Sequence, residues 1–394
     1  MSKLEKLIQQ YCPDGVEYVR LGDILSVNRG KRLTKTQLSD DGKYYVYHGS
    51  KDTPLGKYSQ FNVKGNTTIV VNTGGIGGVK YCNEDFWCSD GSFWIGHSAL
   101  LNDKYVYYYL SPKENYFASQ KRVGGVPTID RSTVENVEIP VPPLPVQEEI
   151  VRVLDAFTEL QAELQAELQK RKQQYNFYRD NLLNFKNINR GGQEIKWMKL
   201  KDVATQWYRG AGIKREEVGN EGMPCIRYGE IHTSYNIWFK DCISHTDETK
   251  QATKKYAEYG DILFAITSED IPLVGNSVAY LGKEKIMVGG DIVVMKHNQD
   301  PRYMAYALST SDAIKQKGKG KVKSKVVHTN VPSLQEIVIP IPPMEEQQRI
   351  ADILDRFDTL TNDLTSGLPA EMEKRRQQYE FYRDKLLTFK RKEA

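Results

Sequence analysis

The side chains best suited to binding a ligand are basic and hydrogen-bonding residues that lie in short, Gly-containing turns. The stretch RGKRLTK brings Arg29, Lys31, Arg32 and Lys35 together within seven residues. Ammonium and guanidinium groups bind phosphate oxygens, and an arginine can also pair through two hydrogen bonds with the edge of a guanine. Such a turn therefore predicts contact with the phosphates of a polyanionic partner, and it suits base edges where that partner is DNA.

Similar polar turns recur in both halves of the chain. In the first half the predicted DNA-binding residues are Arg29, Lys31, Arg32, Lys35, Tyr47, His48, Ser50, Lys51, Asn72 and Thr73. In the second half they are Arg209, Lys214, Arg215, Arg227, Tyr228, Glu230, Ser268, Glu269 and Asp270. Carboxylates belong to this set because Glu or Asp can accept a hydrogen bond from cytosine N4, although either one repels phosphate. The competing interpretation of each residue is an exposed turn position without a ligand.

A separate lysine-rich stretch, KQKGKGKVKSK from Lys315 to Lys325, has a lysine at every second position. Its two glycines predict a loop rather than a helix. Lysines bind phosphates without reading sequence, so this loop is expected to add affinity for any DNA. The predicted phosphate contacts are Lys317, Lys319, Lys321 and Lys323. A solvated loop without a ligand is the competing interpretation.

Catalytic motifs are missing from the sequence. The chain has no GxxxxGK[ST] loop for nucleotide phosphates, no HExxH zinc motif and no NPPF or NPPY motif of adenine methyltransferases. The turn NTGGIGGVK follows a strand-like run but lacks GxGxxG spacing, and the ExK at Glu194–Lys196 has no acidic partner motif. The chain is therefore predicted to have no catalytic residue, no metal site and no cofactor of its own.

Composition is that of an ordinary soluble protein of two or three domains, with 394 residues and a net charge of +4. No apolar run approaches the roughly 18 residues needed to span a bilayer, so no membrane partner is expected. The five cysteines are an odd number without CxxC spacing, which favours neither disulfides nor zinc. These features predict a cytoplasmic protein.

An internal duplication organises the chain. IPVPPLPVQEEIVRVL from Ile139 to Leu154 returns 200 positions later as IPIPPMEEQQRIADIL. KRKQQYNFYRDNLLNF from Lys170 to Phe185 likewise returns as KRRQQYEFYRDKLLTF, now 204 positions later. A fainter match places Arg29-Gly30 over Arg209-Gly210. The chain therefore reads as globule, helical segment, globule, helical segment.

Each helical segment has an apolar seam with alternating spacings of three and four residues, which is typical of a coiled coil. The expected seam positions are Ile150, Phe157, Leu164, Tyr175 and Leu182, and then Ile350, Phe357, Leu364, Tyr379 and Leu386. The first helix is predicted from Gln147 to Phe185. Gly367 and Pro369 predict a kink or break in the second. Two such helices are expected to pair antiparallel as a spacer.

The predicted fold class is α+β, with pseudo-two-fold symmetry. Two α/β globules at residues 1–138 and 196–338 alternate with long helical spacers at 139–195 and 339–394. Short β-like runs such as NTTIVV, separated by Gly-containing turns, favour substantial sheet in both globules.

This order, the Pro-rich hinges and the QQYxFYRDxLL tails resemble the specificity subunit of type I restriction–modification systems over essentially the whole chain. The resemblance implies two target recognition domains that read a bipartite, asymmetric site in double-stranded DNA. It also implies helical spacers that bind two modification (methyltransferase) subunits and, through them, restriction (translocase) subunits. S-adenosylmethionine, ATP and magnesium would then be cofactors of those partners.

Two recognition domains on one face of DNA must sit about one helical turn apart, ~34–36 Å, and a helical pair sets such a distance better than a flexible linker. Two other classes of function remain open at this point. One is a DNA-binding regulator without restriction partners, and the other is a coiled-coil scaffold. A scaffold would not need basic turns repeated in both globules. Co-purification of an adenine methyltransferase with this chain would separate a specificity subunit from both alternatives.

Overall fold

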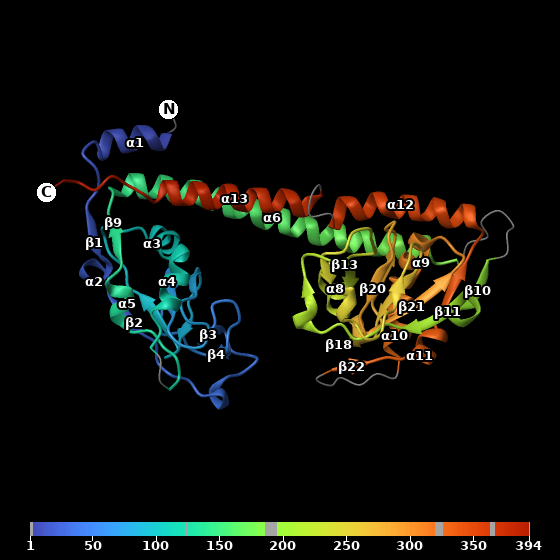
Figure 1. Cartoon of the computed structure of the whole chain (residues 1–394). Helices are drawn as coiled ribbons and strands as arrows, with labels where there is room; N and C mark the ends of the chain where they lie inside the picture. Colours follow the sequence, from blue (N-terminus) through green and yellow to red (C-terminus); the bar gives the residue numbers. More distant parts are fainter. Residues whose placement is uncertain (1–2, 123–124, 186–194, 320–325, 363–366, 394) are drawn as a thin grey trace. The chain divides into compact units, whose positions relative to one another are not determined.

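The computed structural model describes residues 3–122, 125–185, 195–319, 326–362 and 367–393, and Figure 1 shows its elements. The chain divides into two compact units. Unit 1 contains Met1–Glu163 and Glu373–Ala394, and unit 2 contains Leu164–Met372. Each unit therefore combines one predicted globule with parts of both helical segments. Within the described ranges, no helix is long and apolar enough to cross a membrane.

Two small sheets form the globule of unit 1. The antiparallel order β2-β8-β5-β6 joins β2 (Val27–Arg29), β8 (Ser92–Ile95), β5 (Thr67–Val71) and β6 (Val79–Cys82). The order β4-β3-β7 joins β4 (Gly56–Tyr58), β3 (Tyr44–Tyr47) and β7 (Trp87–Cys88). The sequence TTIVV of β5 is β-branched throughout and fully buried, as suits a central strand.

Helices and a third strand pair complete unit 1. The helices are α1 (Lys3–Tyr11), α2 (Leu21–Ile24), α3 (Asp103–Leu110), α4 (Glu114–Ser119) and α5 (Arg131–Glu135). Strand β1 (Tyr18–Arg20) pairs antiparallel with β9 (Glu138–Pro140), which leads into the first Pro-rich hinge. Helix α3 packs on β5 and β6, so its tyrosines lie between the sheet and the hinge.

Unit 2 repeats this plan with longer sheets. The order β11-β21-β17-β19-β14 joins β11 (Ala204–Arg209), β21 (Ile292–His297), β17 (Ile262–Ala265), β19 (Ser277–Tyr280) and β14 (Trp238–Phe239). The order β12-β15-β13-β20-β16 joins β12 (Val218–Gly219), β15 (Ser244–Thr246), β13 (Met223–Ile226), β20 (Ile286–Val288) and β16 (Tyr256–Ala257). Strand β10 (Lys196–Lys199) pairs with β23 (Val338–Ile341) as β1 pairs with β9.

The remaining short elements of unit 2 surround these sheets. They are α7 (Leu200–Val203), α8 (Tyr228–Thr233), β18 (Thr267–Ser268), α9 (Pro301–Leu308), α10 (Ser311–Gly318), β22 (Val327–His328) and α11 (Val331–Gln335). Helix α9 packs on β17 and β19, the position that α3 takes in unit 1.

Three helices make up the predicted spacers. Helix α6 (Leu144–Leu182) has 39 residues, and at 1.5 Å per residue it is about 58 Å long. It begins three residues before the predicted start because Pro145 is tolerated in a first turn, where its missing N–H costs nothing. It also ends before Phe185. The second spacer contains α12 (Met344–Asn362) and α13 (Leu368–Leu386), and the predicted break is confirmed at Gly367, which is not helical and directly precedes α13.

Helix pairing is antiparallel within each unit. In unit 1 Phe157, early in α6, stacks on Tyr382, late in α13, with ring centroids 5.7 Å apart. In unit 2 Tyr178, late in α6, stacks on Phe357 of α12 at 6.0 Å. These are the same two residue types at duplicated positions, so each pairing repeats the other (Figure 1).

The seam itself is shifted from its predicted centre. Ile150, Ile350 and Tyr175 are buried as expected, but Leu183 and Leu387 are buried more deeply than the predicted Leu182 and Leu386. Partial exposure is found at Phe157, Leu164 and Tyr379 and, at 39%, at Phe357. Leu364 lies outside the described residues. The seam is therefore buried at its ends and more open where the stacked rings lie.

Each Pro-rich hinge is fixed to its globule by a buried glutamine. Gln147 donates through Nε2 to the carbonyl of Pro142, 2.7 Å away, and Gln347 donates to that of Pro342 at 2.8 Å. Both side chains are buried. A residue before proline cannot continue a helix, so the hinge carbonyls need such a partner.

Tyrosines of α3 and α9 bind the same two hinges. In each unit we call the hinge, its buried glutamine and these tyrosines the joint. Tyr105 donates to the carbonyl of Pro140 at 3.2 Å, and Tyr303 donates to that of Pro340 at 2.8 Å. Tyr108 and Tyr306 then donate to Asp155 and Asp355, at 2.5 and 2.7 Å. The identical residues of the duplicated hinge thus hold each helix on its globule.

Candidate nucleic-acid interface

The duplicated Arg-Gly turns end equivalent strands. Arg29 is the last residue of β2 and Arg209 the last of β11. A Cβ atom on Gly30 would lie 2.2 Å from the carbonyl oxygen of Ser89, and one on Gly210 would lie 2.2 Å from that of Gly289. Only glycine fits so close to a neighbouring backbone, and this explains the repeat of the Arg-Gly pair.

Both arginines are oriented by the loop that they cross. Nε of Arg29 donates to the carbonyl of Asp90 at 3.1 Å, and Nε of Arg209 donates to that of Gly290. Arg209 also forms an ion pair with Asp291, with Nη2 and Oδ1 2.7 Å apart. Both side chains remain exposed, so each presents a positioned guanidinium at the surface. Positioned guanidinium groups suit bases and phosphates alike.

The loop at residues 89–91 gathers further predicted residues of unit 1. The N–H of Gly91 donates to Nδ1 of His48 at 3.2 Å, and Nδ1 lies 3.4 Å from Asp90. Nδ2 of Asn72 donates to the carbonyl of Asp90 at 3.2 Å. The structure therefore brings Arg29, His48 and Asn72 around one loop, which the sequence did not indicate.

Three predicted residues of unit 1 have structural roles instead. Asn72 is 2% exposed and holds the loop from inside, so it cannot reach a base. Tyr47 is buried, and its ring packs edge-on against Phe86 with centroids 5.7 Å apart. The ammonium of Lys51 lies 2.7 Å from the carboxylate of Glu114, which neutralises its charge. Burial therefore contradicts the expected exposure of Asn72 and Tyr47, whereas DNA contact by the paired but partly exposed Lys51 stays a prediction.

The remaining predicted residues of unit 1 stay accessible. Lys31, Arg32 and Lys35 are exposed, while Ser50 and Thr73 are partly exposed. The hydroxyl of Thr73 donates to the carbonyl of Pro127 at 3.1 Å, which ties this turn to the segment before α5. DNA contact by this set stays a prediction, with Arg29 and His48 added to it.

In unit 2 the carboxylate of Glu230 is buried and used as a helix cap. Oε2 accepts from the N–H of Arg227 at 3.0 Å, and Oε1 accepts from the hydroxyl of Ser244 at 2.6 Å. Ser268 is buried too, and its hydroxyl accepts from the N–H of Asp270. Neither side chain can contact a base, so both predictions are corrected.

Other predicted residues of unit 2 remain available. Lys214, Arg215, Tyr228, Glu269 and Asp270 are exposed. Arg227 is partly exposed and lies 3.7 Å from Glu230, its ion-pair partner. The N–H of Ser89 donates to the carbonyl of Tyr47, the residue before His48. The N–H of Gly289 donates in the same way to the carbonyl of Ile226, the residue before Arg227. Arg227 therefore occupies the position of His48. The two units thus offer different side chains at one equivalent position.

The lysine-rich segment begins as a helix rather than a loop. Lys315 to Gly318 belong to α10, and Lys317 is 5% exposed, so it is not a phosphate contact in this structure. Its Nζ donates to the hydroxyl of Ser277 at 3.2 Å, and burial lowers its pKa to about 7. Lys319 is exposed as predicted, and Lys321 and Lys323 lie outside the described residues.

Acidic residues beside the arginines were missed by the sequence reasoning. Asp90 and Asp291 lie in SDGS and GGDI, which follow Cys88 and Val288 at duplicated positions. The two aspartates are one position out of step, because Asp90 aligns with Gly290 and Asp291 with Gly91, so the sequence carried no clear signal for them. Within the described part of the chain, no cluster of metal-ligating side chains occurs. Four of the five cysteines are buried and none forms a disulfide.

Comparison with known proteins agrees with this geometry. The sequence model described as "Type I restriction modification DNA specificity domain" matches residues 13–171 and 193–374. The EcoR124I/EcoR124II type I specificity subunit of Escherichia coli is 33% identical over all of this chain and 98% of its own length. A putative type I specificity subunit of Haemophilus influenzae is 27% identical over 98% of both chains.

Solved structures share the fold. The type I restriction–modification S subunit of M. genitalium has a TM-score of 0.55 at 17% identity, over 95% of this chain and 96% of that one. A chain from a study of type I restriction–modification assembly and conformational transition has a TM-score of 0.61 at 16% identity, over 95% and 98%. With its family match in both halves, this chain belongs to the type I restriction–modification DNA specificity family.

Proposed function

We propose that this chain reads a two-part, asymmetric site in double-stranded DNA, with one half-site read by each unit. The observation that carries the proposal is the pair of equivalent Arg-Gly turns, each with an exposed guanidinium held by a backbone carbonyl. Two equivalent turns provide one base-contacting surface for each half-site. Their neighbours differ, with His48 in one unit and Arg227 in the other, so the two half-sites differ as well.

Catalysis is assigned to partner subunits. The chain supplies no catalytic group in this proposal, and S-adenosylmethionine, ATP and magnesium act in the modification and restriction subunits. Its own contribution is to place a chosen sequence before a methyltransferase. In this proposal, modification of adenine depends on the affinity of the spacer helices α6, α12 and α13 for two modification subunits.

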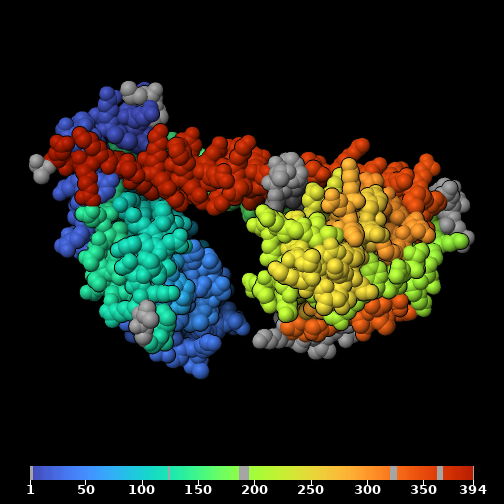
Figure 2. Space-filling view, in the orientation of Figure 1, coloured from blue at the N-terminus to red at the C-terminus, as the bar shows by residue number. Residues whose placement is uncertain are grey.

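Exposed aromatic rings on the helices supply equivalent docking faces. Phe177 and Tyr178 are 63% and 42% exposed in unit 2, and Phe381 and Tyr382 are 63% and 43% exposed in unit 1. Figure 2 shows the surface of α13, the helix that contains Phe381 and Tyr382, uncovered in unit 1. Large exposed rings mark protein interfaces, and two matching faces suit two copies of one partner.

Sequencing of methylated sites tests DNA reading. A complex of this chain with its modification subunit should methylate adenines only within a recognition sequence of two defined parts separated by a gap. Modification subunit alone is the control and should show no such pattern. Methylation governed by a single continuous sequence, or unchanged by removal of this chain, would contradict the proposal.

Native mass measurement tests docking. Phe381→Glu should cost the complex one modification subunit, and Phe177→Glu should cost it the other, because a charge cannot enter an apolar interface cheaply. Both side chains are largely exposed, so the fold should tolerate the changes. The double variant should bind none. Two bound subunits in every variant would place the interface elsewhere.

A further inference from the structure

The outer edge of strand β6 in unit 1 differs from its counterpart in unit 2. Strand β5 lies between β8 and β6, as β17 lies between β21 and β19, and all of these pairs are antiparallel. The registers also match, so that Tyr81 of β6 corresponds to Ala279 of β19. β6 is the last strand of its sheet, whereas β19 has one further neighbour, β14.

In unit 2, β14 covers that edge with backbone hydrogen bonds. It runs parallel to β19, and the N–H of Ala279 donates to the carbonyl of Ile237 at 3.0 Å. Alternate residues of an antiparallel pair direct their N–H groups away from the partner strand. The N–H of Tyr81 therefore points outward from β6, as that of Ala279 does from β19.

Aromatic side chains of the covering segment fill the space beside the edge. Phe239 is buried in one cluster with Ile226, Tyr280 and Ile286. The ring of Tyr235 stacks on Phe239 with centroids 4.1 Å apart. This half of the segment thus supplies an apolar plug.

Polar side chains of the same segment reach the spacer helix. Nε1 of Trp238 donates to Asp355 of α12 at 2.9 Å. Nδ2 of Asn236 donates to both carboxylate oxygens of Asp358, at 2.7 and 2.8 Å. The segment therefore joins the sheet edge to the helix within unit 2.

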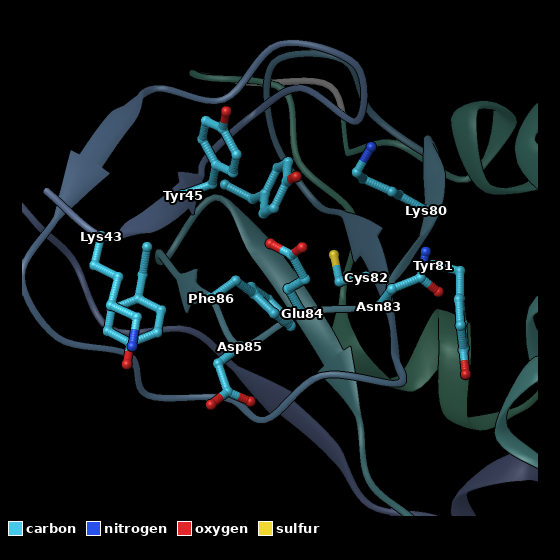
Figure 3. A pocket seen from close by; sticks show the side chains of 11 residues that line it. Lys43, Tyr45, Lys80, Tyr81, Cys82, Asn83, Glu84, Asp85 and Phe86 are labelled. Carbon is cyan, nitrogen blue, oxygen red and sulfur yellow. The ribbon is translucent and has the colours of Figure 1, made fainter. Parts of the chain in front are cut away.

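In unit 1 the place of the aromatic plug is a cleft of 680 Å³. Three of its lining residues, Tyr47, Cys82 and Phe86, correspond to Ile226, Tyr280 and Ile286 around the plug. Figure 3 shows Tyr45 on one side of this cleft and Lys80 and Tyr81 on the other, with Glu84 and Cys82 between them. The smaller Cys82 leaves room that Tyr280 takes up in unit 2.

The place of the polar contacts is hollow as well. A second cleft, of 360 Å³, borders β6 and reaches Asp155 and Thr158 of α6. These residues stand where Asp355 and Asp358 stand in α12. Both clefts share Lys80, Tyr81 and Asn83, so they flank one continuous strand edge.

We propose that the edge of β6 and its two clefts form a docking site for an extended segment of a partner protein. The segment adds as a parallel strand, accepts a hydrogen bond from the N–H of Tyr81, and places an aromatic side chain in the larger cleft. This is strand addition to a sheet edge, in which the backbone gives affinity and the pocket gives specificity. The chain's own residues 235–239 show the chemistry that fits.

The charges at the site favour a peptide over a nucleic acid. The larger cleft has Lys43 and Lys80 on its walls but also Glu84 and Asp85, so the lining is balanced. In the smaller cleft the ammonium of Lys104 lies 2.8 Å from Asp155 and is already paired. A phosphate backbone gains nothing from a neutral lining, whereas a peptide strand needs only the edge donors and an apolar hollow.

A synthetic peptide with the sequence of Tyr235–Lys240 is the probe, labelled and titrated into the full chain by fluorescence anisotropy. It should bind the wild-type chain with a dissociation constant in the millimolar range or below. Tyr81→Pro removes the outward N–H together with the tyrosine ring, a change that an edge strand tolerates, and it should weaken binding at least tenfold. Tyr81→Ala is the matched control, because it loses the same ring but keeps the N–H.

A second probe guards against a folding effect of proline. The Phe239→Ala version of the peptide should bind the wild-type chain at least tenfold more weakly than the parent peptide. Equal binding by Tyr81→Pro and Tyr81→Ala, or no binding of the parent peptide at millimolar concentration, overturns the proposal. Self-association of the chain that only Tyr81→Pro abolishes would assign the edge to a second copy, and it overturns the choice of partner.

Discussion

In unit 1 the buried amide of Gln147 accepts from the N–H of Asn102 at 2.8 Å, and in unit 2 Gln347 accepts from that of Asp300 at 3.0 Å. The turns beside the Arg-Gly pairs have no such correspondence. Where unit 1 buries Asn72 against the loop carbonyl, the equivalent residue of unit 2 is the apolar Ile266. The joint repeats its chemistry, and the turns change theirs.

That contrast teaches which residues carry which duty. The joint must hold the same kind of helix on each globule, so both copies need the same buried hydrogen bonds. The turns are proposed to read two different half-sites, so they need different side chains on one backbone frame. Glycines 30 and 210 keep the frame, and the residues around them vary.

Breaking one joint should have the largest effect. Gln347→Leu leaves the N–H of Asp300 and the carbonyl of Pro342 buried without partners, which costs about 2–4 kcal/mol of unfolding free energy. Gln147→Leu should do the same in unit 1. Calorimetry with hydrogen exchange of α9 and α3 measures the loss and shows which unit carries it. Gln348→Leu is the control, because the neighbouring Gln348 is exposed. If Gln347→Leu and Gln348→Leu melt alike, the joint is not what holds the unit.

Replacement of the buried Lys317 of unit 2 should stabilise the protein, whereas Gln347→Leu destabilises it. Its folded pKa of about 7 lies below the usual 10.5, so between these values the unfolded chain binds a proton that the folded chain does not. Stability then rises with pH through this window, and the penalty is complete below pH 7. At about 1.4 kcal/mol per pKa unit, Lys317→Met should raise the unfolding free energy by roughly 4 kcal/mol at pH 7.

Denaturant titrations at several pH values check this result. The advantage of Lys317→Met should shrink steadily between pH 7 and pH 10, because the wild-type ammonium loses its proton as it folds. Lys319→Met, at an exposed site two residues away, should have no such dependence. A constant difference across the range would mean that Lys317 is not a buried, depressed cation.

Removal of one arginine from an Arg-Gly turn tests whether the two units recognise their half-sites independently. Arg29→Ala should relax one half of the methylated sequence and Arg209→Ala the other, each with a loss of about 1–3 kcal/mol of base discrimination. Sequencing of methylated sites gives both halves in one experiment. Arg20→Ala removes an exposed arginine outside the Arg-Gly turns and should leave both halves intact. A change in both halves from Arg29→Ala alone would refute independent reading by the two units.

The helices, their break and the duplicated order could be predicted from the sequence because they rest on long apolar periods and repeated identities. The start of α6 was missed because Pro145 suggests a boundary, although a first turn accepts it. Tyr105 and Tyr303 were missed because DKYVYYYL and PRYMAYAL share few identities, and only the fold shows their common hydrogen bond to the hinge.

Burial decided the candidate site, and sequence could not supply it. Glu230, Ser268 and Asn72 are polar residues near turns, which describes a base reader and a structural cap equally well. Lys317 belongs to a run of lysines, yet the helical period of α10 turns this one inward, where its stem packs beside Gly275. A polar residue type predicts chemistry, but only the backbone path tells whether that chemistry faces the solvent.

The smallest expected effect separates affinity from reading. Lys319 is exposed just after α10, so in the proposed function it contacts a phosphate and no base. Lys319→Ala should weaken binding to all sequences alike and reduce the slope of log K against log salt concentration by about 0.9, the value for one phosphate contact. Titrations of the complex with specific and unrelated DNA at several salt concentrations give this slope. Lys250→Ala, on an exposed turn whose lysine already lies 3.4 Å from Asp247, is the matched control and should keep the wild-type slope. A change confined to the specific sequence would make Lys319 a base reader, and it would place the boundary between the two kinds of contact inside the lysine-rich segment.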